Sequence, residues 1–201
     1  MSTANTLSLS IVNNSQKAGS FILFQVYPNM DQFRMLPVVW KSIQLPTGST
    51  GRFEWRTSFL FVAGTGDVRP GGRFSQQTSA DADPKGNNVN TLSGGKGFMS
   101  FGRPERGGRP DTLTLKTESS LPMNGITAGI GMEEAAVIVG PVMPNYNVNY
   151  DTSPQYRVAF GNFQQGEMLN PTIQSVVVDF SRGSSMKAEY NADGSWTVNQ
   201  G

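Results

Sequence analysis

The residues of this sequence that could do chemistry are almost all carboxylates and basic side chains. The chain has 15 Asp and Glu and 16 Lys and Arg, but no His and no Cys. These absences remove the commonest general base, the commonest metal ligand and every disulfide or thiolate site. The sequence therefore predicts no cofactor and favours a protein that is not an enzyme.

A hydrolase that uses carboxylates alone is the catalytic alternative. Its candidate residues are Glu133, Asp151, Glu167 and Asp179. Glycosidase chemistry would need two of them within about 5–9.5 Å of each other in one concave site. Glu133 and Glu134 are adjacent, so along a strand they point to opposite faces. Glu167 follows a glycine, where a carboxylate is expected to accept hydrogen bonds from turn amides.

The segment 81–86, DADPKG, begins like a calcium-binding loop of the form D-x-D-x-x-G. However, Lys85 stands at a ligand position, and the twelfth position is Leu92 rather than the bidentate Glu that the loop requires. We interpret this segment as a surface turn, and the sequence predicts no metal site.

The segment 94–109, GGKGFMSFGRPERGGR, combines basic and aromatic residues on a glycine-rich backbone. Such a composition suits single-stranded nucleic acid, phosphate or carboxylate surfaces, or an acidic neighbouring subunit, and a plain glycine-rich hairpin loop is the alternative. A single basic loop is a weak nucleic-acid signal, so we interpret the segment as a contact arm that reaches another copy. The residues of this contact arm are Lys96, Phe98, Phe101, Arg103, Arg106 and Arg109.

Charge is unevenly distributed along the chain, although its net value is only +1. Residues 52–109 hold nine basic and five acidic residues, whereas residues 110–201 hold four and nine, a balance of −5. We interpret this asymmetry as ordinary surface charge, and a polyanion-binding patch or a head-to-tail contact between subunits are the alternatives. The expected partner is another copy of the chain, in a homo-oligomer or a higher assembly.

The elements that must position these residues are predicted to be strands. Apolar and polar residues alternate at 7–11, at 145–150, and along 52–61, where Phe53, Trp55, Phe59 and Phe61 are expected on one face. Residues 188–198 predict a terminal hairpin with an Asp-Gly turn. One helical turn fits only 131–136.

Composition agrees with this pattern. The chain has 201 residues, of which 23 are Gly, 12 are Pro and only 15% are charged. Short strands between glycine and proline turns predict an all-β fold, a single-domain antiparallel β-sandwich of about a dozen strands over residues 1–201, with a Gly/Arg-rich loop at 94–109.

The N-terminus, MSTANTLSLSIV, has no basic region and no apolar stretch of signal-peptide length. Nothing approaches the roughly 20 apolar residues that span a bilayer. We therefore expect no membrane span, and a protein that is cytoplasmic or is exported without a classical signal peptide.

Residues 155–180 form the most distinctive stretch, which is expected to be a strand, a shaped turn and a second strand. Gly161 and Gly166 bracket the turn, and Pro171 closes it. We call its central part the signature corner. It comprises Phe160, Gly161, Phe163, Gln165, Gly166 and Glu167.

The signature corner resembles the FG-x-F-x-QGE-x-L segment of the RhiA family of small bacterial proteins. Other segments resemble the family in order along the chain, and they are residues 8–15, 52–55, 128–132 and 191–198. The resemblance implies rhizosphere expression under quorum-sensing control and a link to nodulation, with no catalytic residues to transfer. Segment 94–109 departs from the family pattern, so no role is carried over to the contact arm.

Together these features predict a non-catalytic bacterial β-sandwich protein that acts by self-association or surface binding. A carbohydrate-binding, lectin-like module is the first alternative, with a glycan as partner, because exposed aromatics beside amides and carboxylates suit sugars. The carboxylate-only hydrolase is the second alternative. Nucleic acid is not an expected partner.

Overall fold

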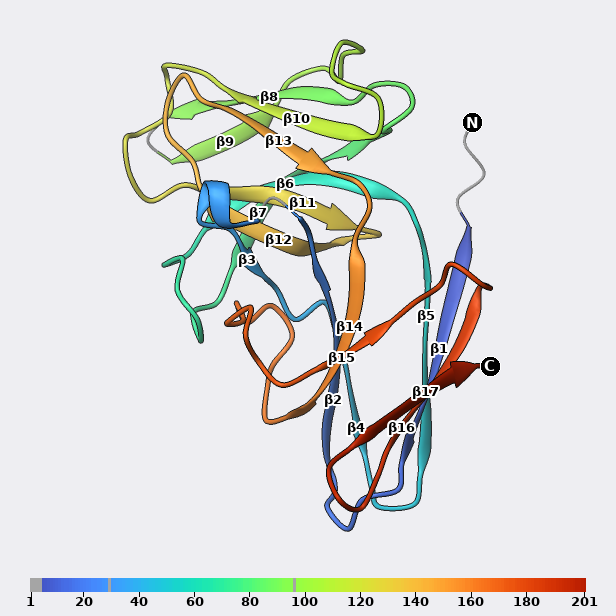
Figure 1. Cartoon of the computed structure of the whole chain (residues 1–201). Coiled ribbons are helices and arrows are strands. Elements are labelled where there is room, and N and C mark those ends of the chain that lie inside the picture. The colour runs from blue at the N-terminus through green and yellow to red at the C-terminus, as the bar shows by residue number, and fades with distance from the viewer. Residues whose placement is uncertain (1–4, 29, 96) are drawn as a thin grey trace.

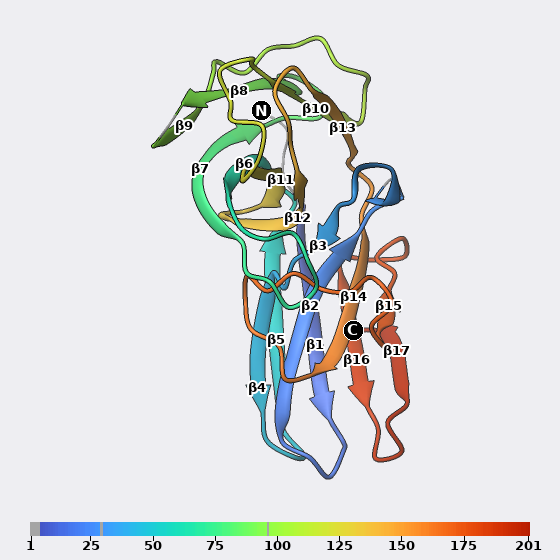
Figure 2. The ribbon, with the colours of Figure 1, turned by 90° about the vertical axis from the view of Figure 1, so that its left-hand side faces the viewer.

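The computed structural model describes residues 5–28, 30–95 and 97–201. In these residues the chain forms seventeen strands and one short 3-10 helix, η1 (Met30–Phe33). The strands build four sheets, which are stacked as two sandwiches joined end to end (Figures 1 and 2). The predicted all-β, sandwich-type architecture is thereby confirmed, with more strands than expected.

The lower sandwich in Figure 1 consists of two four-stranded sheets. The β1 sheet has the order β17-β16-β1-β5 and contains β1 (Thr6–Asn13), β5 (Thr50–Arg56), β16 (Ser185–Tyr190) and β17 (Trp196–Gln200). The β2 sheet has the order β15-β14-β2-β4 and contains β2 (Gly19–Val26), β4 (Lys41–Leu45), β14 (Gln155–Gly161) and β15 (Val176–Val178). Aromatic contacts, such as Phe160 stacked on Tyr190 at 4.6 Å, join the two sheets.

The upper sandwich combines a five-stranded and a four-stranded sheet. The β11 sheet has the order β3-β12-β11-β6-β7 and contains β3 (Leu36–Pro37), β6 (Phe59–Thr65), β7 (Ser75–Ala82), β11 (Thr127–Met132) and β12 (Ala135–Pro141). The β10 sheet has the order β13-β10-β8-β9 and contains β8 (Val89–Gly95), β9 (Phe98–Phe101), β10 (Thr112–Thr117) and β13 (Asn147–Asp151). Phe61 and Phe101 meet between these sheets, with ring centroids 6.1 Å apart.

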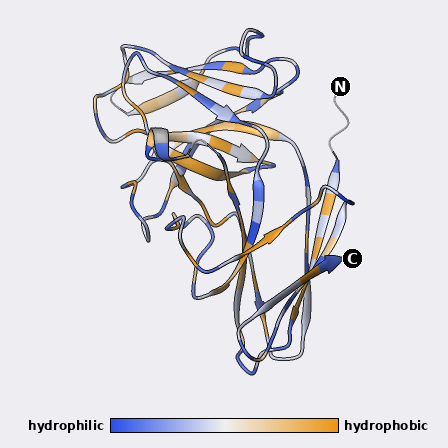
Figure 3. Cartoon of the chain, viewed as in Figure 1, coloured by the Kyte–Doolittle hydropathy of each residue, from blue (hydrophilic) through white to orange (hydrophobic). Residues whose placement is uncertain are grey.

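One cluster of buried hydrophobic residues draws on all four sheets, through Leu9, Leu23, Ile130 and Leu113 among others. Each fully buried side chain of this size contributes about 1.5–3 kcal/mol to folding. Figure 3 shows hydrophobic and hydrophilic residues alternating along the strands of the β10 sheet, as expected for strands with one buried face. The single-domain assignment for residues 1–201 stays a prediction.

Two local expectations were wrong. Residues 52–61 are two strands in different sheets, because Thr57 and Ser58 form a tight link in which the Ser58 amide donates to Arg56 O at 2.9 Å. Phe53 therefore belongs to the β1 sheet and Phe61 to the β11 sheet. Residues 131–136 form no helical turn.

The segment 131–136 is instead a β-hairpin turn between β11 and β12. Glu133 occupies its left-handed position, with φ of 58°. The terminal hairpin is confirmed, with Tyr190 opposite Trp196 and Gly194 at φ of 82°. Pairing is antiparallel throughout the named strands except in two pairs, β1 with β16 and β8 with β10.

Candidate functional site

The signature corner lies at the end of β14 and fastens it to the chain between β3 and β4. The Gly166 amide donates to Val39 O at 2.9 Å, and the Gln165 side-chain amide donates to Trp40 O at 3.0 Å. Gly166 has φ of 84°, a left-handed conformation that glycine adopts without strain. These hydrogen bonds attach the signature corner to the segment that connects the β11 sheet with the β2 sheet. The corner therefore has a structural role.

The aromatic residues of the signature corner pack inward. Phe163 joins the small buried cluster that contains Ile22 and Leu169. Gly161 lies so close to Phe163 that a Cβ would come within 2.5 Å of its ring. Glu167 Oε2 accepts a hydrogen bond from the Gln164 amide at 3.0 Å, which is the turn-amide role expected for this carboxylate.

The segment 94–109 is only partly a loop. Its first residues complete β8, and Phe98–Phe101 form β9, the edge strand of the β10 sheet. Phe98 has 67% of its surface exposed, whereas Phe101 packs inward against Phe61. Residues three apart in a strand lie on opposite faces, so Phe101 belongs to the core and not to a contact arm. Lys96 lies outside the described residues.

The loop 102–109 is fastened to the β10 sheet by Asn88, a side chain that is only 3% exposed. Asn88 Nδ2 donates to Arg109 O at 2.9 Å and to Thr112 O at 3.2 Å. Its Oδ1 accepts from the Gly107 and Gly108 amides at 3.3 and 3.1 Å. One buried amide therefore holds the end of this loop and the start of β10.

The three arginines of this loop are free at the surface. Arg103, Arg106 and Arg109 are exposed, and none of them makes a salt bridge or side-chain hydrogen bond with the described residues. Their guanidinium groups are available to a partner, while the backbone that carries them is held in place.

A cleft of about 670 Å³ opens where the chain crosses between the two sandwiches. Two of the links that cross between the sandwiches line it, residues 57–58 between β5 and β6 and residues 152–154 between β13 and β14. Its full lining is Asn5, Thr57, Ser58, Phe59, Asp81, Ala82, Asp83, Pro84, Lys85, Asp111, Met132, Thr152, Ser153, Pro154 and Tyr156.

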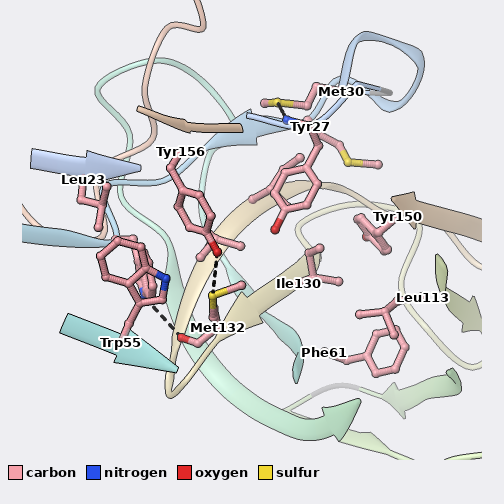
Figure 4. Close-up of a cluster of buried hydrophobic side chains, with 14 of the residues drawn as sticks. Leu23, Tyr27, Met30, Trp55, Phe61, Leu113, Ile130, Met132, Tyr150 and Tyr156 are labelled. Atoms are coloured by element: carbon pink, nitrogen blue, oxygen red, sulfur yellow. Dashed lines mark hydrogen bonds between the residues drawn. The ribbon is translucent and has the colours of Figure 1, made fainter. Parts of the chain in front are cut away.

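The floor of the cleft is apolar and rests on a buried polar network. Figure 4 shows the Tyr156 hydroxyl pointing at the Met132 sulfur, to which it donates at 3.7 Å. Gln25 also donates to this sulfur, at 3.5 Å, and accepts from the Tyr27 hydroxyl at 2.5 Å. Burial raises the pKa of Tyr156, and the nearby Trp55 indole partly offsets this shift.

The rim of the cleft carries polar groups without partners in the described part of the chain. The carboxylates of Asp81 and Asp111, the Lys85 ammonium and the hydroxyls of Ser58 and Ser153 make no side-chain hydrogen bond or salt bridge there. All these residues are exposed, so a ligand can reach them. The cleft therefore combines an apolar floor with free donors and acceptors.

The segment 81–86 contributes to this rim as a turn. Asp83 Oδ1 accepts from the Lys85 amide at 3.0 Å, and the Gly86 amide donates to Asp83 O at 3.0 Å. No group of three or more His, Cys, Asp or Glu side chains among residues 5–28, 30–95 and 97–201 could hold a metal ion.

The four carboxylates proposed for a hydrolase have other local roles, and none of them lines the cleft. Glu133 pairs with Lys41 at 2.7 Å, and Asp151 accepts from the Ser153 amide at 2.7 Å. Asp179 accepts from the Ser181 amide and hydroxyl, which lowers the pKa of Asp179.

These features define the class of the chain as an all-β, double-sandwich protein with an open cleft that has an apolar floor and a polar rim. The chain belongs to the RhiA family, whose sequence pattern it matches over residues 4–201. It is 27% identical over 175 residues to Protein RhiA of Rhizobium leguminosarum bv. viciae, covering 85% of this chain and 71% of that protein. No solved structure matches the chain.

Within the described residues, no helix is both long and apolar enough to cross a bilayer. The sequence did not reveal the cleft, because its lining comes from separate segments that only the fold brings together. The turn 81–86 was the single signal near it, and it was considered only as a metal site.

Proposed function

We propose that this protein is a non-catalytic binding protein that takes a neutral carbohydrate in the cleft between its sandwiches. The observation that carries this proposal is the combination of an apolar floor, formed by Phe59, Met132 and Tyr156, with free polar groups on the rim. Ligand sites of this volume use apolar surface for affinity and a few polar groups for orientation.

Sugar rings match this arrangement chemically. Their C–H faces can lie on the aromatic floor, while their hydroxyls exchange hydrogen bonds with the carboxylates of Asp81 and Asp111 and the hydroxyl of Ser58. Carboxylates accept strong hydrogen bonds from hydroxyl groups. The absence of His and Cys from the sequence supports binding rather than turnover.

A glycan array of plant and bacterial polysaccharides tests the proposal, followed by calorimetry with each oligosaccharide that binds. We expect the double variant Asp81→Asn/Asp111→Asn to weaken binding about tenfold or more, since each carboxylate acceptor contributes about 1–2 kcal/mol. Asp31→Asn, an exposed acid outside the cleft, is the matched control and should bind like the wild type.

An array without hits would contradict carbohydrate binding. Hits that bind Asp81→Asn/Asp111→Asn and the wild type equally would place the carbohydrate elsewhere and remove the cleft from the proposal.

Self-association of the protein is tested by a separate experiment. Low charge and abundant polar side chains favour it, and equilibrium sedimentation at high protein concentration measures it directly. A strict monomer under those conditions would remove self-association as the mode of action.

A further inference from the structure

The outer face of the β10 sheet is an array of polar side chains, which we call the polar face. Opposite them, Leu92, Leu113, Leu115 and Val148 are buried in the core. Cross-strand pairs connect the array, with Thr114 Oγ1 donating to Asn149 Oδ1 at 2.8 Å. The polar face consists of Thr91, Ser93, Ser100, Thr114, Lys116, Asn147 and Asn149.

The polar face is bordered by the arginine loop. Glu105 bridges to Val89 at the start of β8, which β9 does not reach, and a Cβ on Gly108 would lie 3.0 Å from Thr114 Oγ1. The loop 102–109 therefore runs along the edge and one end of this face. Within the loop itself, three free arginines outnumber the one acid, Glu105, so the loop is cationic, whereas the exposed acids Asp111 and Glu118 lie at the two ends of β10.

Phe98 adds one aromatic ring to the same surface. It lies two residues from Ser100 along β9, so both side chains point to the same side of the sheet. Its exposed fraction of 67% is the highest among the large hydrophobic residues of the described chain. An exposed ring on the same face as these hydroxyls is available for stacking.

We propose that the polar face with its arginine loop binds an acidic polysaccharide, a chain of sugars that bears carboxylates. Side chains on this face repeat at about 6.8 Å along a strand and about 4.8 Å between strands, which offers hydroxyl and amide partners to an extended polymer. The arginines pair with repeating carboxylates, because the guanidinium fork matches the carboxylate geometry. Asn88 holds the loop in place, so binding loses less conformational entropy.

Two other partners fit the observations less well. Single-stranded nucleic acid is bound by successive stacking aromatics, and this surface has a single exposed ring. The acidic surplus of residues 110–201 is distributed over turns and strands of all four sheets, with Glu133 and Glu189 in salt bridges. The acids of residues 110–201 in a second copy are therefore not gathered into one patch for the arginines.

Polygalacturonate is the probe for this surface, with dextran as the neutral reference polymer. We expect the protein to bind immobilised polygalacturonate, and binding should weaken steeply between about 50 and 200 mM salt. The triple variant Arg103→Gln/Arg106→Gln/Arg109→Gln should lose about tenfold or more in affinity and most of the salt dependence. Phe98→Ser should weaken binding without changing the salt dependence.

The matched control is Lys17→Gln/Arg56→Gln/Arg182→Gln, which removes the same charge from exposed positions on the lower sandwich. It should bind polygalacturonate within about twofold of the wild type. Equal losses in the two triple variants would overturn the proposal, because binding would then follow net charge alone.

Three further results would also overturn it. They are absence of binding to polygalacturonate, retention on poly-dT in its place, and salt-sensitive self-association that the arginine variant abolishes. The cleft variant Asp81→Asn/Asp111→Asn should bind polygalacturonate like the wild type, so that this proposal and the proposed function fail separately.

Discussion

Single buried polar side chains decide the local shape of this molecule more than any ion pair does. Asn88 and Gln25 are 3% and 0% exposed, and each bonds to partners far away in the sequence. The salt bridges of the described residues, in contrast, join partly exposed side chains, which contribute about 0–1 kcal/mol each. We therefore expect mutation of these buried, uncharged side chains to lower stability more than mutation of the ion pairs does.

Asn88→Ala is expected to release the arginine loop. The variant loses four hydrogen bonds to the loop and its flanks, so its free energy of unfolding should fall by about 1–3 kcal/mol. Urea unfolding measures this loss, and amide exchange of Gly107 and Gly108 should accelerate in the folded protein.

Asn147→Ala is the control, since Asn147 is exposed and its side chain makes no hydrogen bond with the described residues. It should change stability by no more than about 0.5 kcal/mol. If both variants behaved alike, Asn88 would not be the residue that holds the loop.

At the scale of elements, close approach between backbones determines where glycine is required. A Cβ on Gly129, in the centre of β11, would lie 1.9 Å from Ile138 O on the neighbouring strand β12. Gly107, in the arginine loop, has no atom within 4 Å of such a Cβ. A Gly→Ala substitution at each position therefore compares the cost of an added methyl group in a central strand with its cost in an open loop.

Gly129→Ala should destabilise the protein by at least about 3 kcal/mol, because the strands β11 and β12 must separate to admit the methyl group. Gly107→Ala should stay within about 0.5 kcal/mol of the wild type. Thermal and urea unfolding of the two variants measure both values. A mild effect at Gly129 would mean that β11 and β12 are paired differently.

The whole molecule contains tyrosines whose hydroxyls are buried where the sandwiches meet. Burial raises the pKa of Tyr27, Tyr150 and Tyr156 above the ordinary value of 10.0. Their folded pKa values exceed the unfolded one, so the associated stability is fully present below about pH 10 and is lost as the pH rises above it.

We therefore expect alkaline unfolding in which tyrosine ionisation and loss of β-structure coincide. Ultraviolet difference absorbance at tyrosinate wavelengths and circular dichroism measure the two events. Tyr156→Phe should move the unfolding midpoint to higher pH, because one group that favours the unfolded state has been removed. Full tyrosine ionisation near pH 10 in a protein that stays folded would contradict this expectation.

The sequence by itself determined much of the local structure of this protein. Alternation of apolar and polar residues predicted strands such as 7–11 and 145–150, and the Asp-Gly turn predicted the terminal hairpin. The sequence also showed directly that His and Cys are absent, and it showed the motifs around the signature corner. These features depend on neighbouring residues, whose spacing sets the face of each side chain.

Only the tertiary structure decided which sheet each strand joins and which segments meet. The aromatic alternation at 52–61 continues through Thr57 and Ser58, yet the chain passes there from one sandwich to the other. The cleft arises from that crossover together with five segments distant in sequence. Such placements depend on long-range pairing and packing, which local periodicity does not encode.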